Sequence, residues 1–495
     1  MSAAENMTSI GCEFFLVQPD ASPPGAPMAN WGACYAALVA NVWTEPLAIW
    51  LEQGNDGRRI DASPSTYLPI RTSNGIVYAS LSLTDNLLPP KRMAIVFIGS
   101  DTGDPQCPPG VDPKFPTGDF ALHGTGRRNA LRLRTTQPAS VYDVYPYGGL
   151  IAAVPSATLL LPTSTWGAAS LGVTAWPIAN GMAYPGLAIV SLGSTVSITP
   201  PVAIAPGVGV GPGAKSVPTR YVIDPGSILQ FQQPEDLTGS LLTLGAGAPF
   251  SVWGVHSCMS IPSSSSCDSG HVQLPPTQSL GSHHVAARFP ARVVGEEAVP
   301  WRMVALADAT VLTFDPPTIQ PVVTLNAGKT LTVSSPGPFL VRSQNLAHPF
   351  YMTGHMTRAA GARAEGDPET VGVVPVEQWL TSYTFAVEPT YRDTSIVIVQ
   401  GRSEGVFQDV KLDCRKDPLS AWQDVGREGK YQTTWVALQK DGQSVGDCDF
   451  GAHTISSRGP LTVTVWGMDD LVSYAFPAGA GVRKINTVNV ITTPK

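Results

Sequence analysis

The sequence predicts an all-β protein built from internal repeats of about 100 residues, and three observations support this fold class. A short phrase, in which a proline precedes an apolar or alternating run, occurs four times along the chain. The 48 glycines and 46 prolines separate many short apolar stretches, which is typical of short strands joined by tight turns. Apolar residues hardly ever recur at helical spacing. We therefore expect a propeller-like closed ring, with tandem β-sandwiches as the alternative.

The repeated phrases divide the chain into four units. The first phrase starts at Pro138, Pro249, Pro349 and Pro460. A second phrase occurs at Leu161–Thr163, Leu274–Pro276 and Val374–Val376, and a third at Ala175–Pro177, Arg288–Pro290 and Val387–Pro389. One repeat-built β domain is thus expected over 12–495, with units at roughly 12–165, 166–278, 279–378 and 379–495. Residues 1–11 are expected to be a disordered or linker N-terminus, and the terminal strands to complete one sheet that closes the ring.

Individual strands and turns can be placed within the second and third units. Leu187–Ile198 predicts two strands around a turn of small residues, and Trp301–Phe314 predicts two strands around a turn at Ala307. Val322–Val333 predicts a hairpin that turns at Asn326–Gly328. Stretches rich in Pro, Gly or Ala are expected to form surface loops at 103–119, 200–218 and 358–369.

Composition and charge exclude some classes of protein. A net charge of -7 argues against a nucleic-acid groove, which needs a basic face. The apolar runs are far shorter than the roughly 20 residues of a membrane-spanning helix. The first residues lack the basic start and apolar core of a signal peptide. The protein is therefore either cytosolic or exported by a signal that this chain does not carry.

The seven cysteines favour export. They lie in Pro-, Ser- and Gly-containing loops, which suits disulfides in an oxidising compartment better than buried free thiols, the alternative. Zinc is less suitable because no CxxC pair occurs. We expect disulfides between Cys258 and Cys267 and between Cys414 and Cys448. Cys12 with Cys34 is a further candidate pair, which would leave Cys107 without a partner.

Several motifs in a fixed order resemble the amino-terminal region of the IgGFc-binding protein family. The resemblance covers nearly the whole chain and is sharpest from about residue 230 to residue 480. The matching motifs are Asp236–Ser240, Pro249–Gly254, Cys258 with Cys267-Asp268 and His271, Thr324–Gly328, Gly366–Pro368, Pro375–Gln378, Trp466-Gly467, Ser473-Tyr474 and Pro477–Gly479.

This resemblance implies an exported or surface-associated protein with disulfides and a binding or adhesive role. Animal members of the family are large secreted mucus proteins in which von Willebrand D-type modules follow this region. The present chain contains nothing like a D-type module, so it is similar to the stand-alone bacterial form. The family name comes from one animal member, and the resemblance does not by itself imply Fc binding.

The densest polar cluster of the chain combines Asp268 and His271 with Cys267. A carboxylate and an imidazole in a loop suit a ligand or metal site, for which calcium is a possible ion; otherwise no cofactor is expected. The alternative is a disulfide-pinned loop whose polar groups satisfy the backbone. Asp367 belongs to a Gly-Asp-Pro sequence in which Glu369 replaces the histidine of the self-cleaving site of D-type modules, so a tight turn is expected there.

Trp253 and Trp466 lie in equivalent strands of two units. If they are exposed, their rings could stack on sugars, whereas the alternative is packing in the core. No catalytic residues are predicted, because neither a G-x-S-x-G nor an H-E-x-x-H motif occurs.

We therefore expect a secreted, periplasmic or cell-surface protein that recognises a glycan or glycoprotein, with other surface proteins as further candidate partners. One alternative is a polysaccharide-acting enzyme that uses carboxylates such as Asp268 and Asp367. The other is a structural subunit of a cell-surface assembly.

Overall fold

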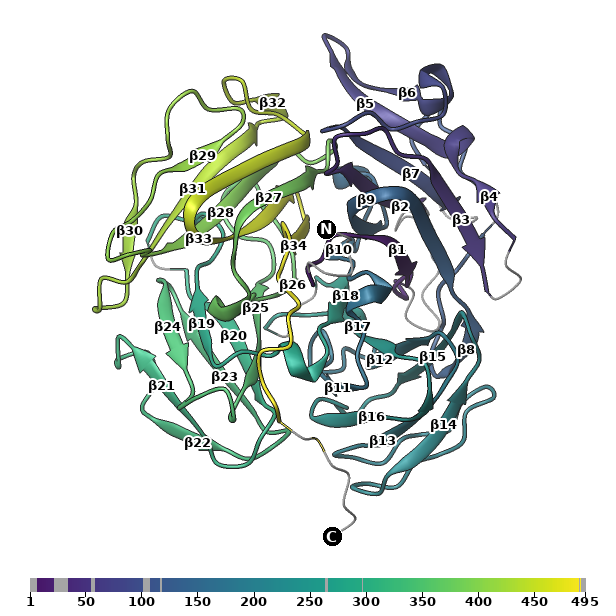
Figure 1. The fold of residues 1–495 in the computed structure, drawn as a ribbon, viewed down its shortest axis with the longest axis vertical. Helices are drawn as coiled ribbons and strands as arrows, with labels where there is room; N and C mark the ends of the chain where they lie inside the picture. The colour runs from purple at the N-terminus through teal and green to yellow at the C-terminus, as the bar shows by residue number, and fades with distance from the viewer. Residues whose placement is uncertain are drawn as a thin grey trace.

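The computed structural model describes residues 7–21, 34–54, 58–100, 107–115, 118–262, 266–295, 297–488 and 490. Four all-β units surround a central axis like the blades of a propeller (Figure 1). Their order around the axis follows the chain, from unit 1 in purple and blue to unit 4 in yellow. The predicted fold class and the favoured ring are confirmed.

The described strands of units 1 and 2 are short, apart from β9. Unit 1 contains β1 (Gly11–Leu16), β2 (Cys34–Asn41), β3 (Ile49–Gln53), β4 (Ile60–Asp61), β5 (Thr66–Thr72), β6 (Gly75–Ser80), β7 (Met93–Ser100), β9 (Leu131–Tyr145) and β10 (Ser156–Leu159). Unit 2 contains β11 (Ala169–Gly172), β12 (Pro185–Ser191), β13 (Ser194–Thr199), β14 (Thr219–Ile223), β15 (Ser227–Gln232), β16 (Ser240–Gly247), β17 (Phe250–Met259) and β18 (Asp268–Leu274), together with β8 (Gly126–Asn129), which pairs with β15.

Units 3 and 4 repeat this pattern. Unit 3 contains β19 (His283–Ala286), β20 (Val299–Ala305), β21 (Thr310–Asp315), β22 (Val323–Leu325), β23 (Thr330–Ser335), β24 (Phe339–Arg342), β25 (Phe350–Met356) and β26 (Glu369–Gly372). Unit 4 contains β27 (Leu380–Val387), β28 (Asp393–Gly401), β29 (Val410–Leu412), β30 (Gln423–Val425), β31 (Tyr431–Lys440), β32 (Gln443–Ser444), β33 (Gly451–Asp469) and β34 (Val472–Pro477). The described helices are short 3-10 turns: η1 (Ser63–Ser65), η2 (Leu81–Thr84), η3 (Gly149–Ile151), η4 (Thr163–Thr165), η5 (Thr277–Ser279) and η6 (Val376–Gln378).

One strand order recurs in every unit. From the axis outward, the strands of unit 3 are β26, β25, β20 and β23, and the same order of chain positions holds in the other three units. The innermost strands are β10, β18, β26 and β34 (Figure 1). Units 2 and 3 each carry a second sheet, and apolar side chains from both sheets form a common core. Each of these units is thus itself a small sandwich, so the ring combines features of both architectures that the sequence suggested.

The repeated phrases have the same structural role in successive units. The first phrase begins or lies in β9, β17, β25 and β33, the strands next to the innermost ones. In the second phrase, Pro162, Pro276 and Pro375 have extended backbones and precede η4, η5 and η6. Proline suits these positions because its fixed φ favours the extended conformation and the amide it lacks is not needed.

The predicted hairpin at Val322–Val333 is wrong. The strand β22 pairs with β21, whereas β23 pairs with β20 in the other sheet of the unit. The chain likewise crosses between the two sheets from β20 to β21 and from β12 to β13. Small turn residues suit a crossing between layers as well as a hairpin, so the local sequence cannot distinguish the two.

The ring closes by packing between the first and last units. Apolar residues of both units form one buried cluster. In the described residues no sheet runs from unit 4 into unit 1, so the expected shared sheet is wrong. Instead, the amide of Ser9 donates to the carbonyl of Ala480 at 2.8 Å, and the amide of Val482 donates to Met7 at 2.7 Å. Residues 7–11 are therefore part of the fold rather than a linker, while residues 1–6 lie outside the described residues.

Three disulfides cross-link the described part of the chain. Two of them, Cys258–Cys267 and Cys414–Cys448, coincide with predicted pairs. The third joins Cys34 to Cys107, and Cys12 is a half-buried free thiol, which corrects the suggested pair of Cys12 with Cys34. In the residues that are described, none of the helices has the length and apolar character required to cross a bilayer.

Candidate functional site

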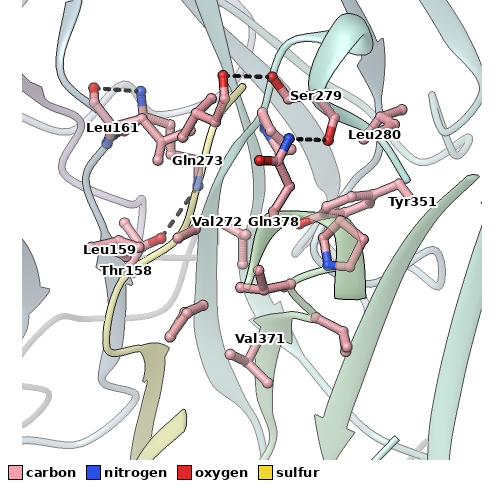
Figure 2. A pocket seen from close by; sticks show the side chains of 18 of the residues that line it. Thr158, Leu159, Leu161, Val272, Gln273, Ser279, Leu280, Tyr351, Val371 and Gln378 are labelled. Atoms are coloured by element: carbon pink, nitrogen blue, oxygen red, sulfur yellow. Dashed lines mark hydrogen bonds between the residues drawn. The ribbon is translucent and has the colours of Figure 1, made fainter. Parts of the chain in front are cut away.

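The ring axis holds a narrow cavity that all four units line. The inner strands β10, β18, β26 and β34 contact one another in sequence around it. Its volume is about 70 Å³, and its wall is mostly apolar (Figure 2). A cavity of this size holds a few water molecules at most, so it cannot take a sugar ring and its neighbours.

The two glutamines in the cavity wall already have partners. Gln273 accepts a hydrogen bond from the amide of Leu161 at 2.7 Å and donates to the hydroxyl of Ser251 at 2.9 Å. Gln378 donates to the carbonyl of Ser279 at 3.1 Å (Figure 2) and to that of Arg483 in unit 4 at 2.8 Å. These amides connect neighbouring units, which explains their burial without a ligand.

Three carboxyl groups gather where the inner strands begin. Asp268 and Glu369 are the first residues of β18 and β26, and Asp367 lies two residues before β26. Asp268 is 1% exposed, and neither of its carboxyl oxygens has a hydrogen-bond partner among the described residues. The Oδ1 of Asp367, in contrast, accepts from the Ser266 hydroxyl and the Ala359 amide, both at 3.0 Å.

Burial changes the acidity of these groups. It raises the pKa of Asp268 well above its ordinary value, and the neighbouring charges of Asp367 and Glu369 add to the increase. Burial also raises the pKa of Glu369, although the backbone amide of Thr370 partly opposes it. The pKa of Asp367 rises to about 6, mainly through burial. Near neutral pH the structure therefore favours the protonated forms of Asp268 and Glu369, whereas Asp367 is mostly ionised.

A metal site at these carboxyls is not preformed. In the described part of the chain, one group of three candidate ligands converges, and it consists of Asp413, Cys414 and His453. The Cys414 sulfur is bonded to Cys448 and thus cannot act as a thiolate ligand. Asp268, Asp367 and Glu369 do not form such a group. Calcium binding at Asp268 and Asp367 stays a prediction.

His271 belongs to a buried polar network between units 1 and 2. Its Nε2 lies 2.8 Å from Oδ1 of Asp143, and its Nδ1 lies 3.0 Å from the hydroxyl of Ser156. The hydroxyl of Tyr35 donates to the second oxygen of Asp143 at 2.9 Å. The residue types are those of a Ser-His-Asp triad, but Ser156, His271 and Asp143 are all fully buried, so a substrate cannot reach the serine hydroxyl. This network fixes β2, β9, β10 and β18 to one another; neither Asp143 nor Ser156 carried a sequence signal.

The two predicted aromatic residues lie in the core. Trp253 is fully buried and packs edge-on against Trp166, with ring centroids 6.3 Å apart. Trp466 packs against Phe289 at 5.0 Å between units 3 and 4. Neither ring offers a free face to a sugar. Trp435, which the sequence analysis missed, is 56% exposed and borders two surface grooves.

The fold and these sites define a propeller-like all-β protein with three disulfides in the described region. Its predicted ligand-binding residues are all buried. The chain belongs to the IgGFc binding protein family, whose model matches residues 156–467, from β10 almost to the end of β33. The family resemblance expected from the motifs is thus confirmed. A search of curated proteins finds no significant match.

Proposed function

We propose that this protein binds a glycan or glycoprotein outside the cytosol and acts by recognition without chemistry. Membership in the IgGFc binding protein family is the observation that carries this proposal. Three disulfides support it, because such bonds persist in oxidising compartments.

The geometry favours recognition at the surface of the ring. The axial cavity is too small for an oligosaccharide, and Asp268 and Asp367 are 1% and 3% exposed. A glycosidase would need to place a sugar between two such carboxyls. Larger hollows lie on unit 4 and between units 3 and 4. Because the ring holds its surface loops on rigid sheets, little ordering would oppose binding there.

The direct test is a binding screen of the purified, oxidised protein against polysaccharides, mucin glycopeptides and IgG Fc, with and without calcium. The expected result is saturable binding to a glycan or a glycosylated protein. Dependence on calcium would support the cation prediction for Asp268 and Asp367. A folded protein that binds nothing in the panel would contradict the proposal and favour the structural-subunit alternative.

A further inference from the structure

We propose that a surface groove centred on Trp435 binds an oligosaccharide chain, with the indole ring stacked on one sugar. This inference rests on the proposed recognition of glycans and assigns it a site. The groove is defined by the residues that line the two hollows beside Trp435, one on unit 4 and one between units 3 and 4.

Trp435 is exposed because of its place in β31. It pairs with Val397 of β28 on one side, whereas β30 covers β31 on the other side only at Tyr431–Thr433. At 56%, its exposure exceeds that of every other tryptophan in the described residues; Trp43 follows at 38%. A large ring left in water is unfavourable unless a partner covers it, and tryptophan is enriched at binding surfaces.

The two hollows together have enough volume for several units of a chain ligand. The hollow on unit 4 has a volume of about 540 Å³, and the one between units 3 and 4 has about 420 Å³. Both are within the range of ligand sites. Ala421, Thr434 and Trp435 line both hollows, so the two hollows adjoin at the indole ring.

Four charged side chains on the unit 4 side of the groove have no ion-pair partner among the described residues. They are Arg415, Lys416, Asp417 and Asp447. Elsewhere on the same unit, by contrast, Glu428 pairs with Arg342 at 2.7 Å and with Lys430 at 2.9 Å, and Lys440 pairs with Asp393.

This set of groups suits a sugar. Vicinal hydroxyls both donate and accept hydrogen bonds, so they match a site that offers cationic donors beside carboxylate acceptors. A nucleic acid would be repelled by the two aspartates and by the net charge of -7. An apolar peptide would leave the charged groups desolvated and unpaired.

The floor of the groove is rigid before any ligand arrives. The Cys414–Cys448 disulfide joins the two loops that border the unit 4 side. The hydroxyl of Thr434 donates to the carbonyl of Ser420 at 3.2 Å, which holds the loop against β31. The indole of Trp422 donates to the carbonyl of Leu419 at 2.9 Å within the same loop. Such a preorganised site loses little entropy on binding.

The test compares the full-length protein with Trp435→Ala and with Trp43→Ala as the matched control for loss of an exposed tryptophan. The probes are O-glycosylated mucin peptides and the same peptides after enzymatic removal of their glycans, measured by titration calorimetry. We expect wild type and Trp43→Ala to bind the glycosylated peptides alike, and Trp435→Ala to bind roughly tenfold more weakly or worse. Thermal unfolding of each variant shows that all three proteins are folded.

The outcomes separate the two proposals. If Trp435→Ala binds the glycosylated peptides as wild type does, the groove is not the site, while glycan recognition by the protein stands. Equal binding of the deglycosylated peptides by wild type would overturn the saccharide site but leave a protein partner. Absence of binding by wild type to these probes and to the glycan panel would overturn both proposals.

Discussion

The ring axis and the Trp435 groove contrast in almost every physical property. The axis is lined by strands that recur in all four units, and its carboxyl groups are buried and held towards the neutral form. The groove belongs to units 3 and 4 alone, and the charged groups on its unit 4 side are exposed and lack ion pairs among the described residues. The difference indicates that the residues repeated in every unit build the scaffold. Recognition is then to be sought in residues that occur once.

The largest expected effect is the difference in stability loss between alanine substitutions at two tryptophans of unit 4. Trp466→Ala should lower the free energy of unfolding by about 3–5 kcal/mol, because it empties a packed site between units. Trp435→Ala should change the same quantity by less than about 0.5 kcal/mol, since its ring is exposed. Urea unfolding followed by circular dichroism measures both. A comparable loss for the two variants would show that the groove is part of the core.

Removal of the disulfide beside the groove or the one beside the axis should have the next largest effect on the free energy of unfolding. Cys414–Cys448 closes a loop of 34 residues beside the groove, and Cys258–Cys267 closes one of 9 residues before Asp268. Cross-linking a longer loop removes more entropy from the unfolded chain. Replacing both cysteines by alanine should therefore lower the free energy of unfolding by about 4 kcal/mol for Cys414–Cys448 and by about 3 kcal/mol for Cys258–Cys267. Denaturant midpoints of the two double variants test this order. The reverse order would mean that the groove loops are held by their hydrogen bonds rather than by the disulfide.

Asp268→Asn probes the buried charge at the axis. An acid whose pKa is raised in the folded state destabilises that state increasingly as the pH rises above its unfolded value of about 3.9. The variant should therefore be more stable than wild type at pH 8, by about 1–3 kcal/mol, and the gain should vanish below about pH 4. Urea unfolding at both pH values in the presence of a chelator checks this.

Calcium provides the control for that prediction. If calcium stabilises the wild type at pH 8 and leaves Asp268→Asn unchanged, the carboxyl is a ligand as the sequence suggested. A variant that is less stable than wild type in chelator at pH 8 would show instead that the carboxylate has a favourable partner, which contradicts the expected gain.

The scaffold could be predicted from the sequence better than the site. Proline phrases and alternating strands are local signals, so the all-β class and the propeller-like arrangement of repeats could be predicted from them. The crossing at Val322–Val333 could not be predicted, because the same turn residues serve a hairpin. The pairing of Cys34 with Cys107 depends on which loops meet in space, and its sequence separation of 73 residues gives no hint of this. The alternation of apolar and polar residues along a strand also does not show which of its faces is buried in the fold. Trp466 and Trp435 therefore look alike in the sequence and differ in the fold.

The smallest expected change in stability concerns His123 at the surface. There the protein stabilises the charged form of a side chain, whereas at the axis it favours neutral carboxyl groups. His123 lies 2.8 Å from Asp119 and 2.9 Å from Asp20, and its hydrogen bonds to these two carboxylates raise its pKa to about 10. Such a group stabilises the fold fully below its unfolded pKa of about 6.5, and this contribution is lost as the pH rises through about 10.

His123→Gln should therefore destabilise the protein at pH 6 by less than about 1 kcal/mol, because the ring is nearly half exposed and solvent screens the pair. The difference from wild type should shrink as the pH approaches 10.5, which chemical unfolding at the two pH values can measure. A difference that stays constant with pH would assign the contribution to hydrogen bonding alone. A shrinking one would show that the surface keeps a charged histidine while the axis keeps neutral carboxyls.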